Sequence, residues 1–183
     1  MRVISGIYGG RVLKSPPDGK TRPTSDRLRE TLFNILAPRI EGSRFLDLCA
    51  GTGAIGMEAL SRGAEHVTFV DRSRKACALI EENLDLLKIP EESTDIQALS
   101  AENFAGRKHE NGWDIVFYDP PYDGEYGVVL FEFGSPENKL LNENGILIAE
   151  HHTKHALPDA AHILRRWRIL KQGETSLSFY ERS

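Results

Sequence analysis

A glycine-rich turn between two apolar segments constrains this chain more than any other feature. The segment that ends near Asp47 is strand-like, and Gly51, Gly53 and Gly56 follow it with the spacing G-x-G-x-x-G at the start of a helix-like segment. Asp71 comes 20 residues after Gly51, at the end of the next predicted strand. Glycines let a backbone approach a ligand closely, and an acid at that second position can accept hydrogen bonds from ribose hydroxyls. The pattern therefore predicts a nucleotide-type cofactor site on an α/β sheet.

Strand-like and helix-like segments alternate through the rest of the chain. We expect strands at 44–49, 66–70, 95–99, 113–118 and 146–150, helices at 54–62 and 73–87, and a closing hairpin at 163–170 and 175–181. Repeated β–α units favour a mainly parallel central sheet with helices on both faces, to which the last hairpin adds an antiparallel part. The expected fold class is α/β and Rossmann-like.

The chain of 183 residues is expected to form a single domain. Residues 1–43 would be an N-terminal extension made of a hairpin and a helix, and residues 44–183 would be the cofactor-binding core. The helix of the extension has an apolar face that begins at Leu28 and is expected to end at Pro38.

An apolar run from Trp113 to Tyr118 ends in Asp119-Pro120-Pro121-Tyr122. Two consecutive prolines remove two backbone donors and fix φ twice, so the chain should leave the sheet in a stiff, extended corner. A carboxylate and an aromatic ring flank this corner and could hold a flat ring that carries an amine. Because open α/β sheets bind ligands at the carboxyl ends of their strands, the corner and the glycine loop should share one edge.

The glycine pattern alone does not separate a dinucleotide site from an S-adenosylmethionine site. The carboxylate of Asp47 would repel a pyrophosphate, whereas it could meet a cationic amino group. The chain also has little room for a separate substrate domain beside a dinucleotide fold. Together with the corner, these points favour S-adenosylmethionine, and a nicotinamide-dependent oxidoreductase stays open as another enzyme class.

Charge is distributed unevenly along the chain. Residues 1–44 hold nine Lys or Arg and four Asp or Glu, a net +5, whereas the remainder has a net charge of −9. A basic front on an acidic body suggests a polyanionic partner that is bound at one end. A solvated N-terminal segment without a binding role is the alternative.

Several classes of protein are not expected. No apolar run approaches the roughly 20 residues of a membrane span, and the N-terminus lacks the features of a signal peptide, so we expect a cytoplasmic protein without membrane contact. The only cysteines are Cys49 and Cys77, and neither a disulfide nor a metal site is expected. His151, His152 and His155 are expected on an irregular segment rather than at a metal.

The motifs resemble those of class I S-adenosylmethionine-dependent methyltransferases that act on exocyclic amines. Their signature is D-x-x-x-G-x-G, followed later by [D/N/S]-P-P-[Y/F]. More narrowly, the segments Arg2-Val3-Ile4-Ser5-Gly6, Gly10-Arg11 with Leu13, and the block from Arg22-Pro23-Thr24 to Asn34 are similar to one family. That family is the bacterial small-subunit ribosomal RNA (guanine-N2)-methyltransferases that modify guanine 966 of 16S rRNA. The resemblance covers essentially the whole chain, and no motif position departs from it.

The resemblance implies roles for the matching positions. The implied cofactor-binding residues are Asp47, Gly51 and Gly53 at the methionine end, Asp71 at the ribose, Ala101 and Glu102 near the adenine, and Thr24. The implied base-holding and catalytic residues are Asp119, Pro120, Pro121 and Tyr122. The implied RNA-binding residues are Arg2, Arg11, Arg22 and Arg27, in a hairpin and a 22–29 block that would face RNA or close over the cofactor.

The implied reaction moves the methyl group of S-adenosylmethionine to the N2 amine of a guanine in 16S rRNA, with no metal. Asp119 and the Pro120 carbonyl would accept hydrogen bonds from the amine and orient its lone pair. The RNA could be free or part of an assembled small subunit, and we expect the enzyme to be a monomer. An amino-methyltransferase that acts on adenine N6 of DNA or RNA, or a non-catalytic RNA-binding module, stays open.

Overall fold

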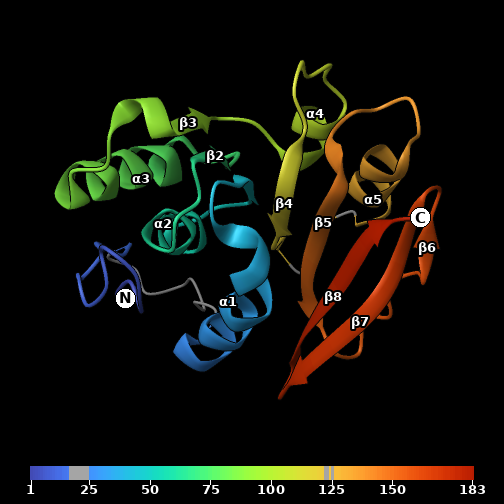
Figure 1. The fold of residues 1–183 in the computed structure, drawn as a ribbon, viewed down its shortest axis with the longest axis horizontal. Coiled ribbons are helices and arrows are strands. Elements are labelled where there is room, and N and C mark those ends of the chain that lie inside the picture. Colours follow the sequence, from blue (N-terminus) through green and yellow to red (C-terminus); the bar gives the residue numbers. More distant parts are fainter. Residues whose placement is uncertain (17–24, 122–123, 125) are drawn as a thin grey trace.

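The computed structural model describes residues 1–16, 25–121, 124 and 126–183. Within these residues, eight strands form one sheet in the order β3-β2-β1-β4-β5-β8-β7-β6 (Figure 1). The strands are β1 (Arg44–Leu48), β2 (His66–Val70), β3 (Thr94–Gln97), β4 (Trp113–Tyr118), β5 (Leu141–His152), β6 (Ala160–Ala161), β7 (Leu164–Gln172) and β8 (Thr175–Arg182). Strands β1 to β5 pair in parallel, whereas β8, β7 and β6 continue the sheet in antiparallel pairs. The predicted mainly parallel sheet with an antiparallel C-terminal part is confirmed.

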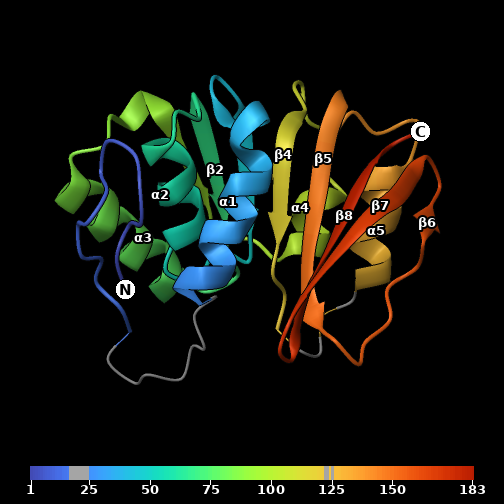
Figure 2. The same cartoon turned by 60° about the horizontal axis from the view of Figure 1, so that its bottom comes forward.

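Helices cover both faces of this sheet (Figure 2). Helices α1 (Asp26–Ile40), α2 (Ala54–Ser61) and α3 (Arg74–Leu87) pack on one face, and α4 (Ala101–Ala105) and α5 (Tyr126–Gly134) pack on the other. A 3-10 turn, η1 (Glu91–Ser93), precedes β3. None of the helices in the described part of the chain has the length and apolar content needed to cross a bilayer.

Each face of the sheet has its own apolar core. Phe117 on β4 and Ile148 on β5 lie in the core under α1 to α3, whereas their neighbours Val116 and Leu147 lie in the core under α4 and α5. This division follows from the period of two in a strand, which sends successive side chains to opposite faces. The same alternation decides which polar side chains reach the site at the end of each strand.

Several predicted boundaries are wrong. Helix α1 continues through Pro38 to Ile40; a proline in the last turn removes one intrahelical bond, and the buried Ile40 holds that turn on the core. Strand β5 begins five residues earlier than expected and runs to His152. His151 therefore lies in a strand rather than on an irregular segment, buried, with its Nε2 2.9 Å from the Oγ of Ser178 on β8. The short α4 and β6 and the apolar α5 were not predicted.

The N-terminal segment forms the predicted hairpin, with an antiparallel bridge between Arg2 and Val12. Its turn lies directly against the end of α2. Gly6 has a φ of +82°, and a Cβ at this position would lie 1.8 Å from the carbonyl oxygen of Ser61. Only glycine allows this conformation and this close approach.

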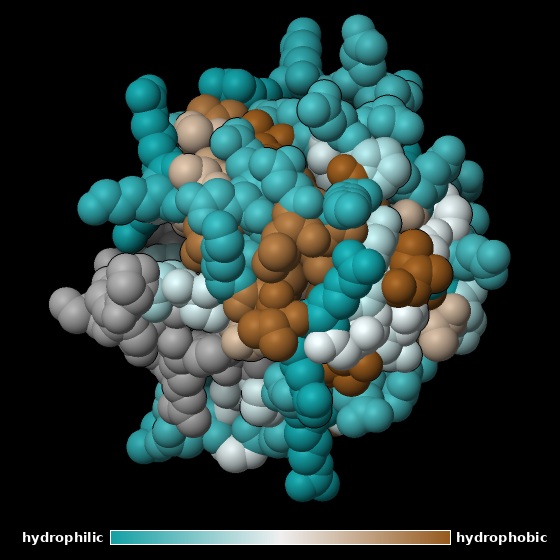
Figure 3. All heavy atoms as spheres, turned by 90° about the vertical axis from the view of Figure 1, so that its left-hand side faces the viewer, coloured by the Kyte–Doolittle hydropathy of each residue, from teal (hydrophilic) through white to brown (hydrophobic). Residues whose placement is uncertain are grey.

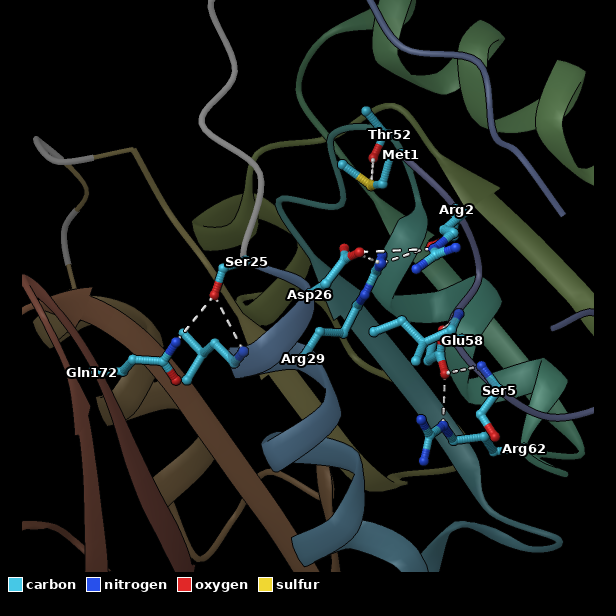
Figure 4. A network of polar contacts seen from close by, with 12 residues as sticks. Met1, Arg2, Ser5, Ser25, Asp26, Arg29, Thr52, Glu58, Arg62 and Gln172 are labelled. Atoms are coloured by element: carbon cyan, nitrogen blue, oxygen red, sulfur yellow. Dashed lines mark hydrogen bonds and ion pairs between the residues drawn. The ribbon is translucent and has the colours of Figure 1, made fainter. Parts of the chain in front are cut away.

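Buried polar side chains fasten the same segment to the core. The carboxylate of Glu58, fully buried in α2, accepts the backbone N–H groups of Ile4 and Ser5 at 2.6 and 3.0 Å (Figure 4). Asn83 on α3 accepts the N–H of Lys14 at 2.8 Å and donates to its carbonyl at 3.2 Å. The N-terminal segment is therefore packed onto α2 and α3.

Candidate functional site

A cavity of about 830 Å³ lies at the carboxyl ends of the parallel strands. Its walls come from the loop after β1, the ends of β2 and β5, the corner after β4, the start of α4, the N-terminus with the start of α1, and the turn between β7 and β8. The predicted site residues that line it are Asp47, Gly51, Asp71, Ala101, Glu102, Asp119, Pro120 and Pro121. The structure thus brings the glycine loop and the proline corner to one cavity. Thr24, Arg22 and Tyr122 lie outside the described residues.

The glycines of the loop have two different structural tasks. Gly51 has a φ of +55°, and a Cβ added there would meet only the Cys49 carbonyl, at 4.0 Å. Gly53, with a φ of +75°, does not line the cavity; its added Cβ would lie 3.1 Å from side-chain atoms of Ile80 and Met57 in the core. Gly51 therefore keeps backbone open to a ligand, which fits a cofactor lying against the loop, whereas Gly53 serves the turn and its packing.

Asp47 lies under this loop and is 2% exposed. Its Oδ2 accepts the N–H of Gly56, in the first turn of α2, at 2.9 Å. Burial raises the pKa of Asp47 to about 8, the bond from Gly56 opposes this shift, and the charge of Asp71 adds to it. A cationic group that enters the cavity would stabilise the ionised form of this carboxyl, which fits the ammonium group of S-adenosylmethionine.

Asp71, just after β2, ties two loops together. Its Oδ2 accepts the N–H of Gly51 at 2.9 Å, and its Oδ1 accepts the N–H of Ser73 at 2.8 Å. Ser73 in turn caps α3, because its Oγ accepts the N–H of Ala76. The carboxyl therefore shapes the glycine loop from the end of β2.

The start of α4 forms a further wall. The Oγ of Ser100 accepts the N–H of Asn103 at 3.2 Å and caps this helix. The cap places Ala101 and Glu102 in the first turn, where both line the cavity.

The corner after β4 places Asp119, half-buried, in the wall of the cavity. Its backbone N–H donates to the Leu48 carbonyl at 3.2 Å, which continues the pairing of β4 with β1 past the end of the strand. Burial is the main cause that raises the pKa of the Asp119 carboxyl well above its usual range, followed by the charges of Glu150 and Asp47. Gly124 closes the turn through a 2.7 Å bond from its N–H to the Pro121 carbonyl. An acidic group held this way favours ligands that donate hydrogen bonds or carry positive charge.

The N-terminal wall contains a buried arginine. Arg29 is 1% exposed, lines the cavity, and donates to the carbonyl of Arg2 at 2.7 Å and to Asp26 at 3.0 Å (Figure 4). Of the two alternatives expected for the 22–29 block, the buried side chain of Arg29 therefore agrees with the one in which the block closes over the cofactor site rather than faces RNA. The sequence does hold a signal for its burial, since Arg29 precedes Phe33, Leu36 and Ile40 at helical spacing.

The start of α1 and the turn after β7 meet above the cavity. Ser25 caps α1 by accepting the N–H of Leu28 at 3.2 Å, and the same Oγ lies 3.3 Å from the Nε2 of Gln172 (Figure 4). Met1 also lines the cavity, with its sulfur 3.6 Å from the Oγ1 of Thr52. Sequence reasoning missed Met1, Gln172 and Glu150 as site residues, because no local motif marks them.

The predicted RNA-binding arginines that the structure describes are on the surface. Arg2 and Arg27 are exposed, and Arg2 is 3.9 Å from Asp26. Arg11, also exposed, donates to the Leu87 carbonyl at 3.1 Å.

The face formed by the N-terminal segment and α3 is mostly hydrophilic with an apolar patch near its centre (Figure 3). The exposed large apolar side chains on these two elements are Ile7, Val12 and Leu86.

The described cysteines are free, and the described residues contain no cluster of metal-binding side chains. Cys49 and Cys77 are free thiols, and burial raises the pKa of Cys49. Over residues 1–16, 25–121, 124 and 126–183, no three His, Cys, Asp or Glu side chains group to hold a metal ion.

Known proteins resemble this chain over its whole length. The family model described as "Conserved hypothetical protein 95" matches residues 1–181. The Bacillus subtilis (strain 168) protein named "Putative rRNA methyltransferase YlbH" is 39% identical over 184 residues, which cover 100% of this chain and 99% of that protein. The Escherichia coli (strain K12) protein named "Ribosomal RNA small subunit methyltransferase D" is 33% identical over 188 residues, which cover 100% and 90%.

A solved structure has the same fold. The structure titled "Putative methyltransferase yhhF from Escherichia coli" has a TM-score of 0.88 at 31% sequence identity and covers 100% of this chain and 98% of that one.

Proposed function

We propose a function for this chain on the premise that it belongs to the family described as Conserved hypothetical protein 95, as the match over residues 1–181 shows. The chain is an S-adenosylmethionine-dependent ribosomal RNA methyltransferase, and its acceptor is the N2 amine of a guanine in 16S rRNA, guanine 966. The observation that carries the proposal is the shared cavity, into which the glycine loop and the Asp119 corner both open. The names of the full-length relatives support the rRNA part, and the choice of guanine N2 rests on the family resemblance.

Different walls of the cavity contact different parts of S-adenosylmethionine. Asp47 holds the ammonium group at the methionine end, and the open backbone at Gly51 lets the molecule lie against the loop. Asp71 accepts hydrogen bonds from the ribose hydroxyls, and Ala101 and Glu102 border the adenine. When bound, the cofactor supplies a methyl group on a sulfonium centre, which an amine can accept directly.

Asp119 orients the acceptor amine. The lone pair of guanine N2 is delocalised into the ring, so the amine is a weak nucleophile. The Asp119 carboxyl and the Pro120 carbonyl accept its hydrogen bonds, turn the lone pair toward the methyl group and stabilise the positive charge that develops on nitrogen. Because burial and neighbouring acids raise the pKa of Asp119, its Oδ atoms are also suited to take the proton that the amine releases.

The RNA must present the base outside its stack. Tyr122 stacks on the extruded ring, which is worth about 1–3 kcal/mol per base in other proteins. Arg2, Arg11, Arg22 and Arg27 contact the phosphates around it. The partner is 16S rRNA, free or in an assembled small subunit, and the enzyme works as a monomer in the cytoplasm.

Radiolabelled methyl transfer tests this proposal. The wild-type protein is incubated with naked small-subunit rRNA, assembled small subunits or DNA, and the labelled nucleoside is identified after digestion. We expect N2-methylguanosine from RNA or subunits; N6-methyladenosine, or label in DNA alone, would assign the enzyme to another base or nucleic acid. In a thermal-shift measurement, S-adenosylhomocysteine should stabilise the protein, and stabilisation by NAD alone would contradict the cofactor assignment.

A further inference from the structure

Glu150 stands next to Asp119 at the carboxyl edge of the sheet. Strands β4 and β5 pair in parallel, with Phe117 opposite Ile148 and Tyr118 opposite Ala149. The next residues along the two strands are Asp119 and Glu150, and both line the cavity. Two carboxyl groups from neighbouring strands therefore reach the place where the target base is proposed to bind.

The pleat of the sheet directs both side chains to the same face. Phe117 and Ile148 belong to the apolar core under α1 to α3, and a residue two positions further along a strand points to the same side. Asp119 and Glu150 occupy those positions. Asp47, which is opposite Phe117 on β1, belongs to this face as well.

Contacts from neighbouring elements hold the pair in place. The backbone N–H of Asp119 bonds to Leu48, as described above, and the hydroxyl of Tyr126 donates to the backbone carbonyl of Glu150 at 2.9 Å. The ring of Tyr126 packs edge-on against Tyr118, with ring centroids 5.6 Å apart. The charge of Glu150 also contributes to the raised pKa of Asp119, as expected for carboxyl groups that are close together.

We propose that Glu150 is a specificity-determining residue that accepts the N1–H of the target guanine while Asp119 accepts an N–H of its N2 amine. This inference rests on the proposed function. The Watson–Crick edge of guanine carries N1–H beside the N2 amine, so it presents adjacent donors to the adjacent carboxyls. Adenine carries an amine beside an N1 acceptor, and that acceptor would face the carboxylate of Glu150. A buried acceptor opposite another acceptor is unfavourable, so the pair selects guanine although the proline corner alone suits both bases.

The test changes the N1 position of the target base and, separately, the side chain at position 150. Small-subunit RNA is prepared with guanine or 2-aminopurine at the target nucleotide; 2-aminopurine keeps the exocyclic amine at N2 but has an N1 acceptor. The ratio of kcat/KM for guanine over 2-aminopurine is measured for the wild-type protein, for Glu150→Gln and for Glu143→Gln. Glu143 is an exposed glutamate on the same strand that does not line the cavity, and it serves as the matched control.

We expect the wild-type enzyme to prefer guanine by about 10- to 100-fold. Glu150→Gln should reduce this ratio at least about fivefold, since an amide can donate to an N1 acceptor as well as accept from N1–H. Glu143→Gln should leave it unchanged. Unchanged affinity for S-adenosylhomocysteine shows that the Glu150 variant is folded.

Two results would overturn the inference. The first is a ratio of kcat/KM for guanine over 2-aminopurine that is the same in Glu150→Gln and in the wild type. The second is a wild-type enzyme that methylates 2-aminopurine as fast as guanine, and this result needs no variant. Failure of the proposed function looks different, because the wild-type enzyme would then form no N2-methylguanosine at all.

Discussion

The glycine-loop side of the cavity and the strand-exit side both carry acidic side chains, which are buried at Asp47 and half-buried at Asp71, Asp119 and Glu150, but these acids face different groups. Asp47 and Asp71 accept backbone N–H groups of the loop and its flanks, so they hold the shape of the protein. Asp119 and Glu150 stand beside each other, and burial, followed by the charge of Glu150, raises the pKa of Asp119. Carboxyls of the first kind preform a binding surface, whereas carboxyls of the second kind gain most from a ligand that is rich in hydrogen-bond donors.

Removal of the Asp119 carboxyl should have the largest effect on the reaction. Asp119→Ala should lower kcat by about 10²–10³-fold or more, because the amine loses its acceptor and the developing charge loses its partner. The affinity for S-adenosylhomocysteine should hardly change, since the cofactor is assigned to the other side of the cavity. Single-turnover methyl transfer and calorimetric titration measure the two quantities. A parallel loss of cofactor binding would break the comparison, because Asp119 would then belong to the cofactor side.

The free energy of unfolding should depend on pH through the titration of Asp47. Its pKa of about 8 in the folded protein exceeds the unfolded value near 4, so its stabilising contribution is complete below about pH 4 and is lost as the pH rises toward 8. Between pH 5 and 8 the wild-type protein should therefore lose roughly 2–4 kcal/mol of unfolding free energy relative to Asp47→Asn, which cannot titrate. Urea unfolding of both proteins at several pH values measures this difference. Parallel curves would mean that Asp47 is already ionised in the folded protein.

The two positive-φ glycines of the glycine loop, Gly51 and Gly53, should separate ligand binding from packing. Alanine is strained at both positions, but only the Cβ at residue 53 meets core side chains, at 3.1 Å. Gly53→Ala should therefore be less stable than Gly51→Ala by about 1–3 kcal/mol. Gly51→Ala should show the larger loss of affinity for S-adenosylhomocysteine, because its methyl group enters the cavity. Equal losses of stability and affinity in the two variants would remove the distinction.

The smallest effect is expected outside the cavity, on the surface of α1. Arg27→Glu should weaken RNA binding several-fold. The slope of log K against log salt concentration should become shallower by about the amount that one phosphate contact contributes, or slightly more. Lys108→Glu, at an exposed position beyond α4, is the control with the same charge reversal. Binding measured between 50 and 200 mM salt (about fourfold in concentration) compares them. Equal responses would show that net charge, rather than this surface, determines RNA affinity.

Local sequence signals predicted the glycine-loop side of the cavity and the proline corner, whereas nothing local marked Glu150. The strand ending at Leu48, the glycine turn and Asp71 are contiguous or nearly so, and their conformations follow from residue type; the observed φ values at Gly51 and Gly53 agree with that. The corner after Tyr118 was predictable for the same reason, since two prolines leave the backbone few alternatives.

Other members of the site have no such signal. Glu150 sits in a strand that looked ordinary, and it reaches the cavity because β5 pairs with β4 in one particular register. His151, one residue further, was misjudged for the converse reason, since β8 extends the pairing over a segment that resembles a loop.

By itself, then, the sequence determined the α/β class, the glycine loop, the proline corner and the family to which the chain belongs. The first three depend on short-range constraints, namely glycine and proline dihedrals and the periodicity of apolar residues, whereas the family follows from the similarity of its sequence motifs. Only the tertiary structure decided that Met1 and Arg29 line the cavity, that Gly53 serves the core, and that Glu150 stands beside Asp119. Those placements depend on strand register and on packing between segments that are distant in the chain, and no local pattern of residues encodes them.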